Sequence, residues 1–530
     1  MKNISNEVLG IKSLKVRYSR HSSWVLNGID LSLFSGESLA IVGSSGCGKS
    51  TLAQSILKLL PESSSVDGLI SLGGKSINKL DELSMQQLRG EYVGLVFQDP
   101  MSHLNPLMSI GDHLMDIFNS RKLLKTKKWK LRETKRLLNM VGIDIRRIDA
   151  YPHELSGGMQ QRLGIALAIA LNPSLIIADE PTTSLDIKIT NQIMGELSKL
   201  CKELGIALLL ISHDLKLASK WCDRIAIIDR GKIVENDFSE KILRDPSSKT
   251  GREFFKSSNL KEWNIPYQKK IKNTILEVEN LRYWHSDSNF IWRNNWIKAV
   301  DGVSFLLHES ESLGVIGASG CGKSTLCKCL VGLLKIRGGI IRMNGEKIHC
   351  DQNKFSRNQY RNIQMIFQDP FASLNPKMKV MEIISDPYLI HNICSKSQAK
   401  EKVRRLLSQV GLEPTCNFEE KYPGELSGGQ RQRVVIARSL TTKPKVLICD
   451  ESISMLDPQI RFDILNLLAY LKIQFKLSIL FVTHDLIVAK KFCERLLVMD
   501  KGQVIECGET KKIFNNPKSV ITKNLIKNLD

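Results

Sequence analysis

The chain has 530 residues, which is too long for one ordinary domain and predicts two to four. Hydrophobic residues make up 42% and charged residues 25%, close to the average of soluble globular proteins, so global disorder is excluded. Lysine and arginine total 76 against 55 acidic residues, which gives a net charge of +21. Such a charge is typical of proteins with an anionic partner, such as a nucleotide, a nucleic acid or a membrane surface. Lysines that only keep a large protein soluble would give the same balance.

Local composition bears on location and on metal binding. No run of 18 apolar residues occurs, and the first 20 residues lack the apolar core of a signal peptide, so we expect a cytoplasmic chain without a membrane span. None of the twelve cysteines forms a CxxC pair, so no zinc site is expected. The settings of Cys47, Cys321 and Cys449 favour small buried thiols, and Cys327 and Cys329 lie in an apolar helical pattern.

The sequence repeats itself over most of its length. The segment IVGSSGCGKSTL, which begins at Ile41, returns as VIGASGCGKSTL at Val315, 274 residues later. Further segments recur 270 or 271 residues later in the same order: VFQDPMSHLNP as IFQDPFASLNP, ELSGGMQQR as ELSGGQRQR, LIIADE as VLICDE, and SHDL as THDL. This order and spacing predict two homologous domains. The polar stretch 245–273 predicts a terminal helix and a linker, so we expect a first domain over 1–257, a linker over 258–273 and a second domain over 274–530.

The first chemical motif of each domain is a glycine-rich loop. An apolar strand, SLAIV or SLGVI, precedes the pattern GxxxxGK[ST], and a helical pattern follows it. Backbone N–H groups of such a loop and the positive end of the next helix bind phosphate, so both loops are predicted to bind ATP. The predicted phosphate-binding residues are Gly43, Ser44, Ser45, Gly46, Cys47, Gly48, Lys49, Ser50 and Thr51, and Gly317, Ala318, Ser319, Gly320, Cys321, Gly322, Lys323, Ser324 and Thr325. The lysines are expected to reach the β and γ phosphates, and Ser50 and Ser324 the Mg²⁺ ion.

Each domain also has an apolar run that ends in two carboxylates. The runs SLIIAD and KVLICD are typical of buried parallel strands, so Asp179 and Asp450 are expected at the carboxyl ends of strands, beside the glycine-rich loops. There they are predicted to hold Mg²⁺, directly or through water. Neighbouring strand residues point to opposite sides, and Glu180 and Glu451 are therefore predicted to face the attacking water as general bases.

The LSGG segments at residues 155–158 and 426–429 resemble the signature motif of ATP-binding-cassette ATPases, and two copies of the family's pattern cover the chain. The resemblance implies an α/β fold with two tandem P-loop NTPase domains, each with a mainly parallel core sheet, an antiparallel β subdomain and a helical signature subdomain. It also implies that Gln98 and Gln368 are loop glutamines that reach Mg²⁺ and nucleotide, that His213 and His484 are switch histidines, and that Tyr18 and Tyr283 stack on adenine. For the tyrosines alternatives stay open, because Trp284, Trp292 and Trp296 offer competing faces and either tyrosine also suits an ordinary strand.

In that family the signature serine and glycines of one domain cover the nucleotide that the other domain holds. The resemblance therefore implies a head-to-tail pair of domains within this chain. One site would combine Lys49, Asp179, Glu180 and His213 with Ser427, Gly428 and Gly429; the other would combine Lys323, Asp450, Glu451 and His484 with Ser156, Gly157 and Gly158. Both sites are expected to hydrolyse ATP. Ser452 and Met455 depart from the usual proline and alanine near the D-loop, but remove no catalytic group.

The segments QDPMSHLNP and QDPFASLNP closely resemble those of peptide and nickel importer ATPases, in which this region contacts a permease. The resemblance implies an ATP-hydrolysing subunit for peptides or related small solutes, peripheral on the cytoplasmic face of the inner membrane. Its partners would be two integral-membrane permeases and a solute-binding protein, with no specific nucleic acid. Only Cys493 and Cys507 lie near the C-terminus, so no iron–sulfur centre is expected.

Two other functions stay open. A soluble tandem ATPase that acts on the ribosome would also have two such domains, but a long charged linker is its usual mark, whereas the stretch 245–273 is short and broken by Pro246. A fused sugar-importer ATPase tends to have one degraded site, and neither site here lacks a catalytic residue.

Overall fold

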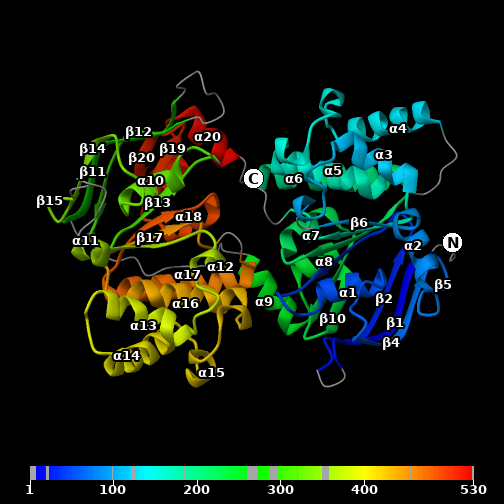
Figure 1. Ribbon diagram of the computed structural model, residues 1–530, viewed down its shortest axis with the longest axis horizontal. Helices are drawn as coiled ribbons and strands as arrows, with labels where there is room; N and C mark the ends of the chain where they lie inside the picture. Colours follow the sequence, from blue (N-terminus) through cyan, green and yellow to red (C-terminus); the bar gives the residue numbers. More distant parts are fainter. Residues whose placement is uncertain are drawn as a thin grey trace. The chain divides into compact units, whose positions relative to one another are not determined.

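The computed structural model describes residues 7–19, 23–97, 100–120, 126–182, 187–258, 273–286, 296–318, 320–348, 357–453 and 456–527. They form two compact units that divide near residue 259 (Figure 1). Each unit has a main parallel sheet, a separate antiparallel sheet and a group of helices, which confirms the predicted α/β fold. The predicted linker lies almost wholly outside the described ranges, so its bounds stay a prediction.

The main sheet of the first unit has the order β10-β9-β3-β8-β7-β6, in which β10 is antiparallel to β9 and the other neighbours are parallel. Its strands are β3 (Ser38–Val42), β6 (Val93–Val96), β7 (Leu175–Asp179), β8 (Ala207–Ser212), β9 (Arg224–Asp229) and β10 (Lys232–Phe238). The antiparallel sheet has the order β2-β1-β4-β5, with strands β1 (Glu7–Arg17), β2 (Leu26–Phe34), β4 (Ser65–Leu72) and β5 (Lys75–Ser76). The strands predicted before the glycine-rich loop and before the acidic pair are therefore present as β3 and β7.

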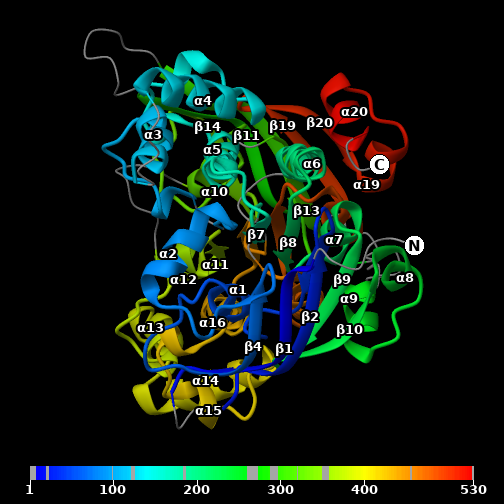
Figure 2. The ribbon, with the colours of Figure 1, turned by 90° about the vertical axis from the view of Figure 1, so that its right-hand side faces the viewer.

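The helices of the first unit divide by position. Helices α3 (Ile110–Ser120), α4 (Lys127–Met140) and α5 (Gly157–Ile169) lie together, at the end of the unit away from β1, β2 and β4, and form the expected helical subdomain (Figures 1 and 2). The other helical segments are α1 (Lys49–Ile56), α2 (Glu82–Glu91), η1 (Pro100–Ser102), η2 (Ile145–Arg147), η3 (Pro152–Glu154), α6 (Ile187–Leu204), α7 (Leu215–Trp221), α8 (Ser239–Arg244) and α9 (Lys249–Ser258).

The second unit repeats this plan. Its main sheet has the order β16-β17-β18-β13-β19-β20, with strands β13 (Ser312–Ile316), β16 (Ile363–Ile366), β17 (Val446–Asp450), β18 (Ser478–Val482), β19 (Arg495–Asp500) and β20 (Gln503–Glu509). Its antiparallel sheet has the order β12-β11-β14-β15, with strands β11 (Thr274–Ser286), β12 (Trp296–His308), β14 (Gly338–Met343) and β15 (Glu346–Lys347).

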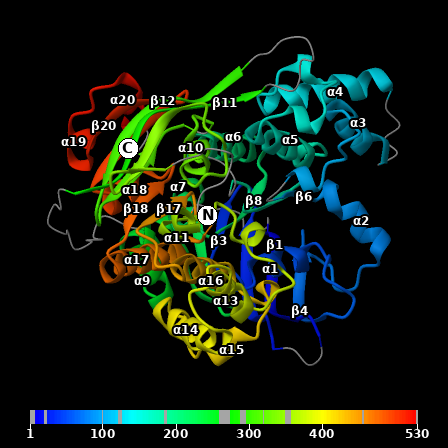
Figure 3. The ribbon, with the colours of Figure 1, turned by 60° about the vertical axis from the view of Figure 1, so that its left-hand side comes forward.

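The helices of the second unit also divide by position. Helices α13 (Val380–Ile390), α14 (Lys396–Gln409) and α15 (Cys416–Glu419) lie away from β11 and β12 (Figures 1 and 3). The signature helix α16 (Gly428–Leu440) packs against α13 and α14. The other helices are α10 (Lys323–Leu330), α11 (Arg357–Asn362), α12 (Pro370–Ser373), α17 (Pro458–Phe475), α18 (Leu486–Phe492), α19 (Thr510–Asn515) and α20 (Val520–Lys527).

Alternate residues of the central strand β3 join different hydrophobic cores. Leu39 and Ile41 pack in the core shared with the antiparallel sheet, whereas Ala40 and Val42 pack in the core shared with helices α3 to α5. Successive strand side chains point to opposite faces, so a strand covered on both faces must be apolar throughout, as SLAIV is. Polar side chains of the site therefore emerge only where these strands end.

Two expectations about composition are tested by the fold. Cys47, Cys321 and Cys449 are buried, as are Cys327 and Cys329 in α10, which confirms the interpretation of these thiols. Burial raises the pKa of the Cys449 thiol to about 12. Across the described ranges, no helix has both the length and the apolar composition needed to cross a membrane.

Candidate active site

The first glycine-rich loop connects β3 to α1 and holds its lysine inside the loop. The Lys49 side chain is only 5% exposed, and its Nζ donates hydrogen bonds to the carbonyl oxygens of Gly43, at 2.8 Å, and Ser44, at 3.0 Å. Gly48, the residue before the helix, has a φ of 108°, which favours glycine. The sharp turn points the N-terminus of α1 toward the loop, as an anion-binding site requires.

The second loop, between β13 and α10, has the same construction. Nζ of Lys323 donates hydrogen bonds to the carbonyl oxygens of Gly317, at 2.9 Å, and Ala318, at 3.0 Å. Gly322 has a φ of 105°, and a Cβ there would lie 2.0 Å from the carbonyl oxygen of Ala299. No side chain fits that position, so glycine is required. Ser319 lies outside the described residues.

The aspartates at the ends of β7 and β17 lie beside the loop serines. Oγ of Ser324 donates a 3.0 Å hydrogen bond to Oδ1 of Asp450. Burial raises the pKa of Asp179 and of Asp450, and in each case the loop serine, Ser50 or Ser324, opposes the shift. Oδ1 of Asp179 is buried and has no hydrogen-bond partner among the described residues. A carboxylate oxygen of this kind next to a hydroxyl fits a Mg²⁺ ion, which prefers oxygen ligands.

The glutamates that follow have an unusual backbone conformation. Glu180 has a φ of 46° and Glu451 a φ of 44°, in the left-handed region where residues other than glycine are strained. Strain of this sort costs about 1–3 kcal/mol and persists where the surrounding structure enforces it, often at functional sites. A backbone hydrogen bond from Glu180 N to the Ile211 carbonyl oxygen, at 3.0 Å, and one from Glu451 N to the Val482 carbonyl oxygen, at 3.1 Å, hold the two residues in place.

Each glutamate contacts a loop lysine and a histidine. In the first unit, Oε1 of Glu180 lies 3.9 Å from Nζ of Lys49, and Oε2 lies 3.2 Å from Nδ1 of His213. Burial lowers the pKa of His213, but the nearby carboxylates, of which Glu180 has the largest effect, together outweigh burial and raise this pKa. The histidine therefore favours its protonated form next to a carboxylate that is predicted to act as a base.

The second unit places the equivalent groups in a similar way. Oε1 of Glu451 lies 4.0 Å from Nζ of Lys323, and Oε2 lies 3.6 Å from Nδ1 of His484. The hydrogen bond with His484 lowers the pKa of Glu451, despite burial. Gln368 donates a hydrogen bond from Nε2 to Oε2 of Glu451, at 3.2 Å. Gln98 lies outside the described residues, so the first unit shows no counterpart of this contact.

The signature segments form the starts of helices α5 and α16. Ser156 and Ser427 are the residues before each helix, and Oγ of Ser427 accepts a hydrogen bond from Gln430 N at 3.3 Å. The second glycine of each motif allows close packing: a Cβ on Gly158 would lie 2.9 Å from Ile189, and one on Gly429 2.7 Å from Ile460. Gly157 and Gly428 open the two helices. The role of these residues toward the other unit's nucleotide stays a prediction.

Tyr18 lies beside the first glycine-rich loop. It follows β1, and its hydroxyl is 3.0 Å from Oγ1 of Thr51 and 3.4 Å from Oε1 of Gln54, both in α1. The ring is 37% exposed. It therefore lies next to the helix that begins at the phosphate-binding loop, where a nucleotide base is expected.

Tyr283 does not have the position that corresponds to Tyr18. Val16 pairs with Leu26 across β1 and β2, and Tyr283 pairs with Val300 across β11 and β12. The residue after Leu26 donates a backbone hydrogen bond to Gly231 in the β9–β10 hairpin, and the residue after Val300 donates one to Gly502 in the β19–β20 hairpin. Leu26 and Val300 therefore correspond. Tyr283 is thus the counterpart of Val16, and it packs against the core.

The counterpart of Tyr18 in the second unit is His285. A residue in the left-handed region precedes each at the same spacing: Ser13, with a φ of 50°, precedes Tyr18, and Asn280, with a φ of 47°, precedes His285. Alignment of Ser-Leu-Lys in β1 with Asn-Leu-Arg in β11 would have found this correspondence. His285 is exposed, and its ring meets the Tyr283 ring edge-on, with centroids 4.9 Å apart.

A cation–aromatic pair adjoins this position in both units, with the partners exchanged. The Arg17 guanidinium lies 4.6 Å from the ring centroid of Trp24. In the second unit the aromatic residue is on the first strand, and Nζ of Lys298 lies 5.3 Å from the ring centroid of Trp284. Arg337 covers Trp296 at 3.6 Å, and Trp292 lies outside the described residues. Arg17, Trp24, Lys298 and His285 were not predicted, because no chemical motif marks them; the alignment of β1 with β11 is the one sequence signal for His285.

Comparison with known proteins shows the family of the chain. A family model described as ABC transporter matches residues 26–183 and 300–454. The chain is 36% identical over 528 residues to the peptidoglycan transport ATP-binding protein YejF of Agrobacterium fabrum, covering 98% of this chain and 96% of that protein. It is 34% identical over 559 residues to the glutathione import ATP-binding protein GsiA of Pectobacterium atrosepticum, covering 98% of this chain and 89% of that protein.

Among solved structures, the post-hydrolysis dimer of the ATP-binding cassette MJ0796 with ADP and Pi matches 44% of this chain and 98% of its own, with 28% identity and a TM-score of 0.40. The family model covers more than half of the chain and falls on both units. The chain therefore belongs to the ABC transporter family, with two fused ATPase domains that hydrolyse ATP.

Proposed function

We propose that the chain is the ATP-hydrolysing subunit of an importer that moves peptides or related small solutes through two separate permeases. The observation that carries this proposal is similarity over 98% of the chain to transport proteins named for glutathione and peptidoglycan, both of which contain peptide bonds. Relatives named for transport favour an importer over a ribosome-acting ATPase. The subunit is expected to bind peripherally to the cytoplasmic face of the inner membrane and to work with a solute-binding protein.

Each polar group of the first unit has a role in this proposal. Lys49 is held at the loop, where its ammonium group would bind the β and γ phosphates, and Ser50 and Asp179 would hold Mg²⁺. The ion would supply positive charge next to the phosphate oxygens. Glu180 accepts a proton from the attacking water, and His213 keeps the glutamate side chain in place. Lys323, Ser324, Asp450, Glu451 and His484 have the same roles in the second unit.

The proposal includes a head-to-tail arrangement of the two ATPase domains. Ser427 to Gly429 would complete the site of Lys49, and Ser156 to Gly158 the site of Lys323. Two ATP molecules would then join the domains, and hydrolysis would release them. The support is the place of both signature segments at helix starts, where exposed N–H groups suit an anion.

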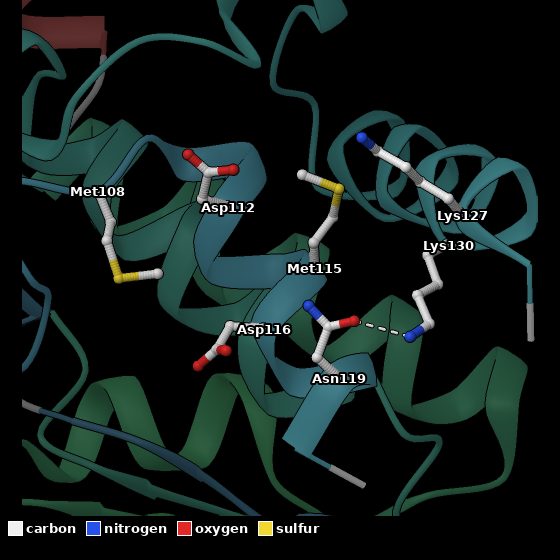
Figure 4. A pocket seen from close by; sticks show the side chains of 7 residues that line it. All are labelled: Met108, Asp112, Met115, Asp116, Asn119, Lys127 and Lys130. Atoms are coloured by element: carbon white, nitrogen blue, oxygen red, sulfur yellow. Dashed lines mark hydrogen bonds between the residues drawn. The ribbon is translucent and has the colours of Figure 1, made fainter. Parts of the chain in front are cut away.

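A surface hollow between α3 and α4 is the proposed place of permease contact. It has a volume of about 410 Å³ and lies next to the QDPMSHLNP segment (Figure 4). The lining residues are Met108, Asp112, Met115, Asp116, Asn119, Lys127 and Lys130. Their mixture of flexible apolar side chains and charges of both signs suits a short amphipathic segment of a permease.

Mass spectrometry of co-purifying proteins tests the importer proposal. The tagged chain, with Glu180→Gln and Glu451→Gln to retain ATP, is captured from gently solubilised cells in the presence of ATP. We expect two polytopic permeases and a solute-binding protein. Ribosomal proteins and RNA without permeases would instead support the ribosome-acting alternative.

ATP turnover tests whether both sites work. Each single variant, Glu180→Gln or Glu451→Gln, is expected to hydrolyse ATP more slowly than the wild type, because each removes one general base. The rate of ATP hydrolysis by the double variant should fall about 100-fold or more, which is the usual contribution of a general base. Full activity in one single variant with none in the other would show that only one site hydrolyses ATP.

A further inference from the structure

The signature helix contacts the segment after the neighbouring strand differently in the two units. In the first unit, Nε2 of Gln161 in α5 donates a 3.3 Å hydrogen bond to the carbonyl oxygen of Phe97, directly after β6. Gln161 is 2% exposed. The contact therefore links the helix that begins with the signature motif to the start of the segment that continues through η1.

The equivalent glutamine of the second unit makes no such contact. Gln432 in α16 is 1% exposed, and neither its Nε2 nor its Oε1 has a hydrogen-bond partner within the part of the chain that the structure describes. A buried amide without a partner is destabilising, so its presence calls for a structural reason.

The strand next to the signature helix also differs between the units at one position. Gly94 in β6 faces α5 so closely that a Cβ there would lie 2.4 Å from the carbonyl oxygen of Ala168. The equivalent residue in β16 is Gln364, which has a Cβ. Gly94 thus permits a close contact between β6 and the backbone of α5 that a side chain at this position would exclude.

The second unit holds the same segment at its other end. Nη1 of Arg438 in α16 donates a 2.6 Å hydrogen bond to the carbonyl oxygen of Ser373, the last residue of α12. Leu167 has the equivalent position in α5 and offers no donor. Burial lowers the pKa of Arg438, yet its guanidinium remains a donor because its ordinary pKa is far above neutral.

We propose that Gln161 and Arg438 are positioning residues that fix the segment after β6 or β16 to the signature helix at opposite ends. Gln161 fixes the start of the segment at Phe97, and Arg438 fixes the end at Ser373. A movement of the signature helix then acts on this segment through a hydrogen bond at its start in one unit and through a hydrogen bond at its end in the other. The two ATPase domains consequently respond differently to the same movement.

Hydrogen exchange of the full chain, without nucleotide, tests the proposal. Gln161→Met should speed exchange in the peptide 93–104 about five-fold, the effect of one neutral hydrogen bond. Arg438→Met should speed exchange in 363–374 about ten-fold or more, since a charged donor is lost. Gln432→Met is the matched control, and exchange in 363–374 should stay the same or become slower. Equal effects of Gln161→Met and Gln432→Met on their own segments would overturn the proposal.

A second variant separates positioning from general destabilisation. Gly94→Ala leaves Gln161 intact but moves α5 from β6, so exchange should rise in 93–104 alone. Adding Gln161→Met should then cause no further increase in the exchange rate, because both changes remove the same contact. Faster exchange throughout the first unit, or additive effects, would count against a positioning role.

ATP turnover provides an independent readout that rests on the proposed function. With Glu451→Gln present, Gln161→Met should lower kcat about five-fold, by the same hydrogen bond, and leave the KM for ATP unchanged. If the first site shows no turnover before the Gln161 change, the proposed function fails while the exchange result still stands. Normal kcat in a variant with faster local exchange would refute the catalytic consequence.

Discussion

The exchange of Tyr18 for His285 at equivalent positions predicts different nucleotide affinities of the two ATPase sites. Tyr18→Ala removes a ring that lies next to the first phosphate-binding loop. His285→Ala removes a smaller ring at the second. Tyr283→Ala removes a ring that packs against the core at the position of Val16, and we expect it to affect folding instead of affinity.

The magnitudes follow from the contacts. Stacking of a base on an aromatic side chain contributes about 1–3 kcal/mol, so Tyr18→Ala should raise the Kd for ATP at the first site about 5- to 150-fold. The imidazole of His285 offers less area for stacking, so His285→Ala should raise the Kd for ATP at the second site about five-fold, the low end of that range. Tyr283 is only partly buried, so its loss should lower the free energy of unfolding by about 2 kcal/mol, less than the 3–5 kcal/mol of a fully buried ring.

Displacement of a fluorescent ATP analogue measures these affinities. Lys323→Ala isolates the first site and Lys49→Ala the second, while chemical denaturation of each variant measures its stability. The reasoning would be refuted if Tyr283→Ala weakened ATP binding at the second site while His285→Ala left it unchanged. A matched gain-of-function test is His285→Tyr, which should strengthen binding there.

Further predictions concern pH and the loop glycines. Because Glu180 raises the pKa of His213 above its unfolded value, the stabilisation from this pair is fully present below about pH 6.5 and is lost as pH rises through the folded pKa. The melting temperature of the wild type should therefore fall more between pH 6 and pH 8 than that of His213→Gln; equal falls would show that the pair contributes nothing. Gly322→Ala should abolish ATP binding at the second site and lower its melting temperature, since the Cβ would lie 2.0 Å from the Ala299 carbonyl oxygen. Gly320→Ala, at a position with no atom within 4 Å, should be milder; similar losses in binding and melting for the two would contradict this explanation.

Much of the fold and of the phosphate site could be predicted because the residues involved are close in sequence. The loop from Gly43 to Ser50 needs only its own glycines and the helix that follows it. Asp179 and Glu180 lie at the end of one strand. An uninterrupted apolar run in the sequence indicates a strand that is buried on both faces. The fold class, the strands beside the loops and the buried cysteines were therefore all accessible without coordinates.

The antiparallel sheet limited the prediction of the aromatic residue in the second unit. Tyr283 matches the expected residue type, but the register of β11 against β12 gives it the position of Val16, and His285 the position of Tyr18. A one- or two-residue shift of register changes which side chain reaches the loop, and the distance in sequence does not reveal that shift.

The sequence by itself determined that the chain has two ATPase domains, since each motif forms its own local structure, and it predicts a set of catalytic residues for each. Only the tertiary structure decided how the two domains differ. Gln161 and Gln432 occupy equivalent positions in nearly identical segments, yet only Gln161 has a hydrogen-bond partner among the described residues. Such a contact joins residues that are far apart in sequence, here Gln161 and Phe97, so only the folded chain reveals whether it forms.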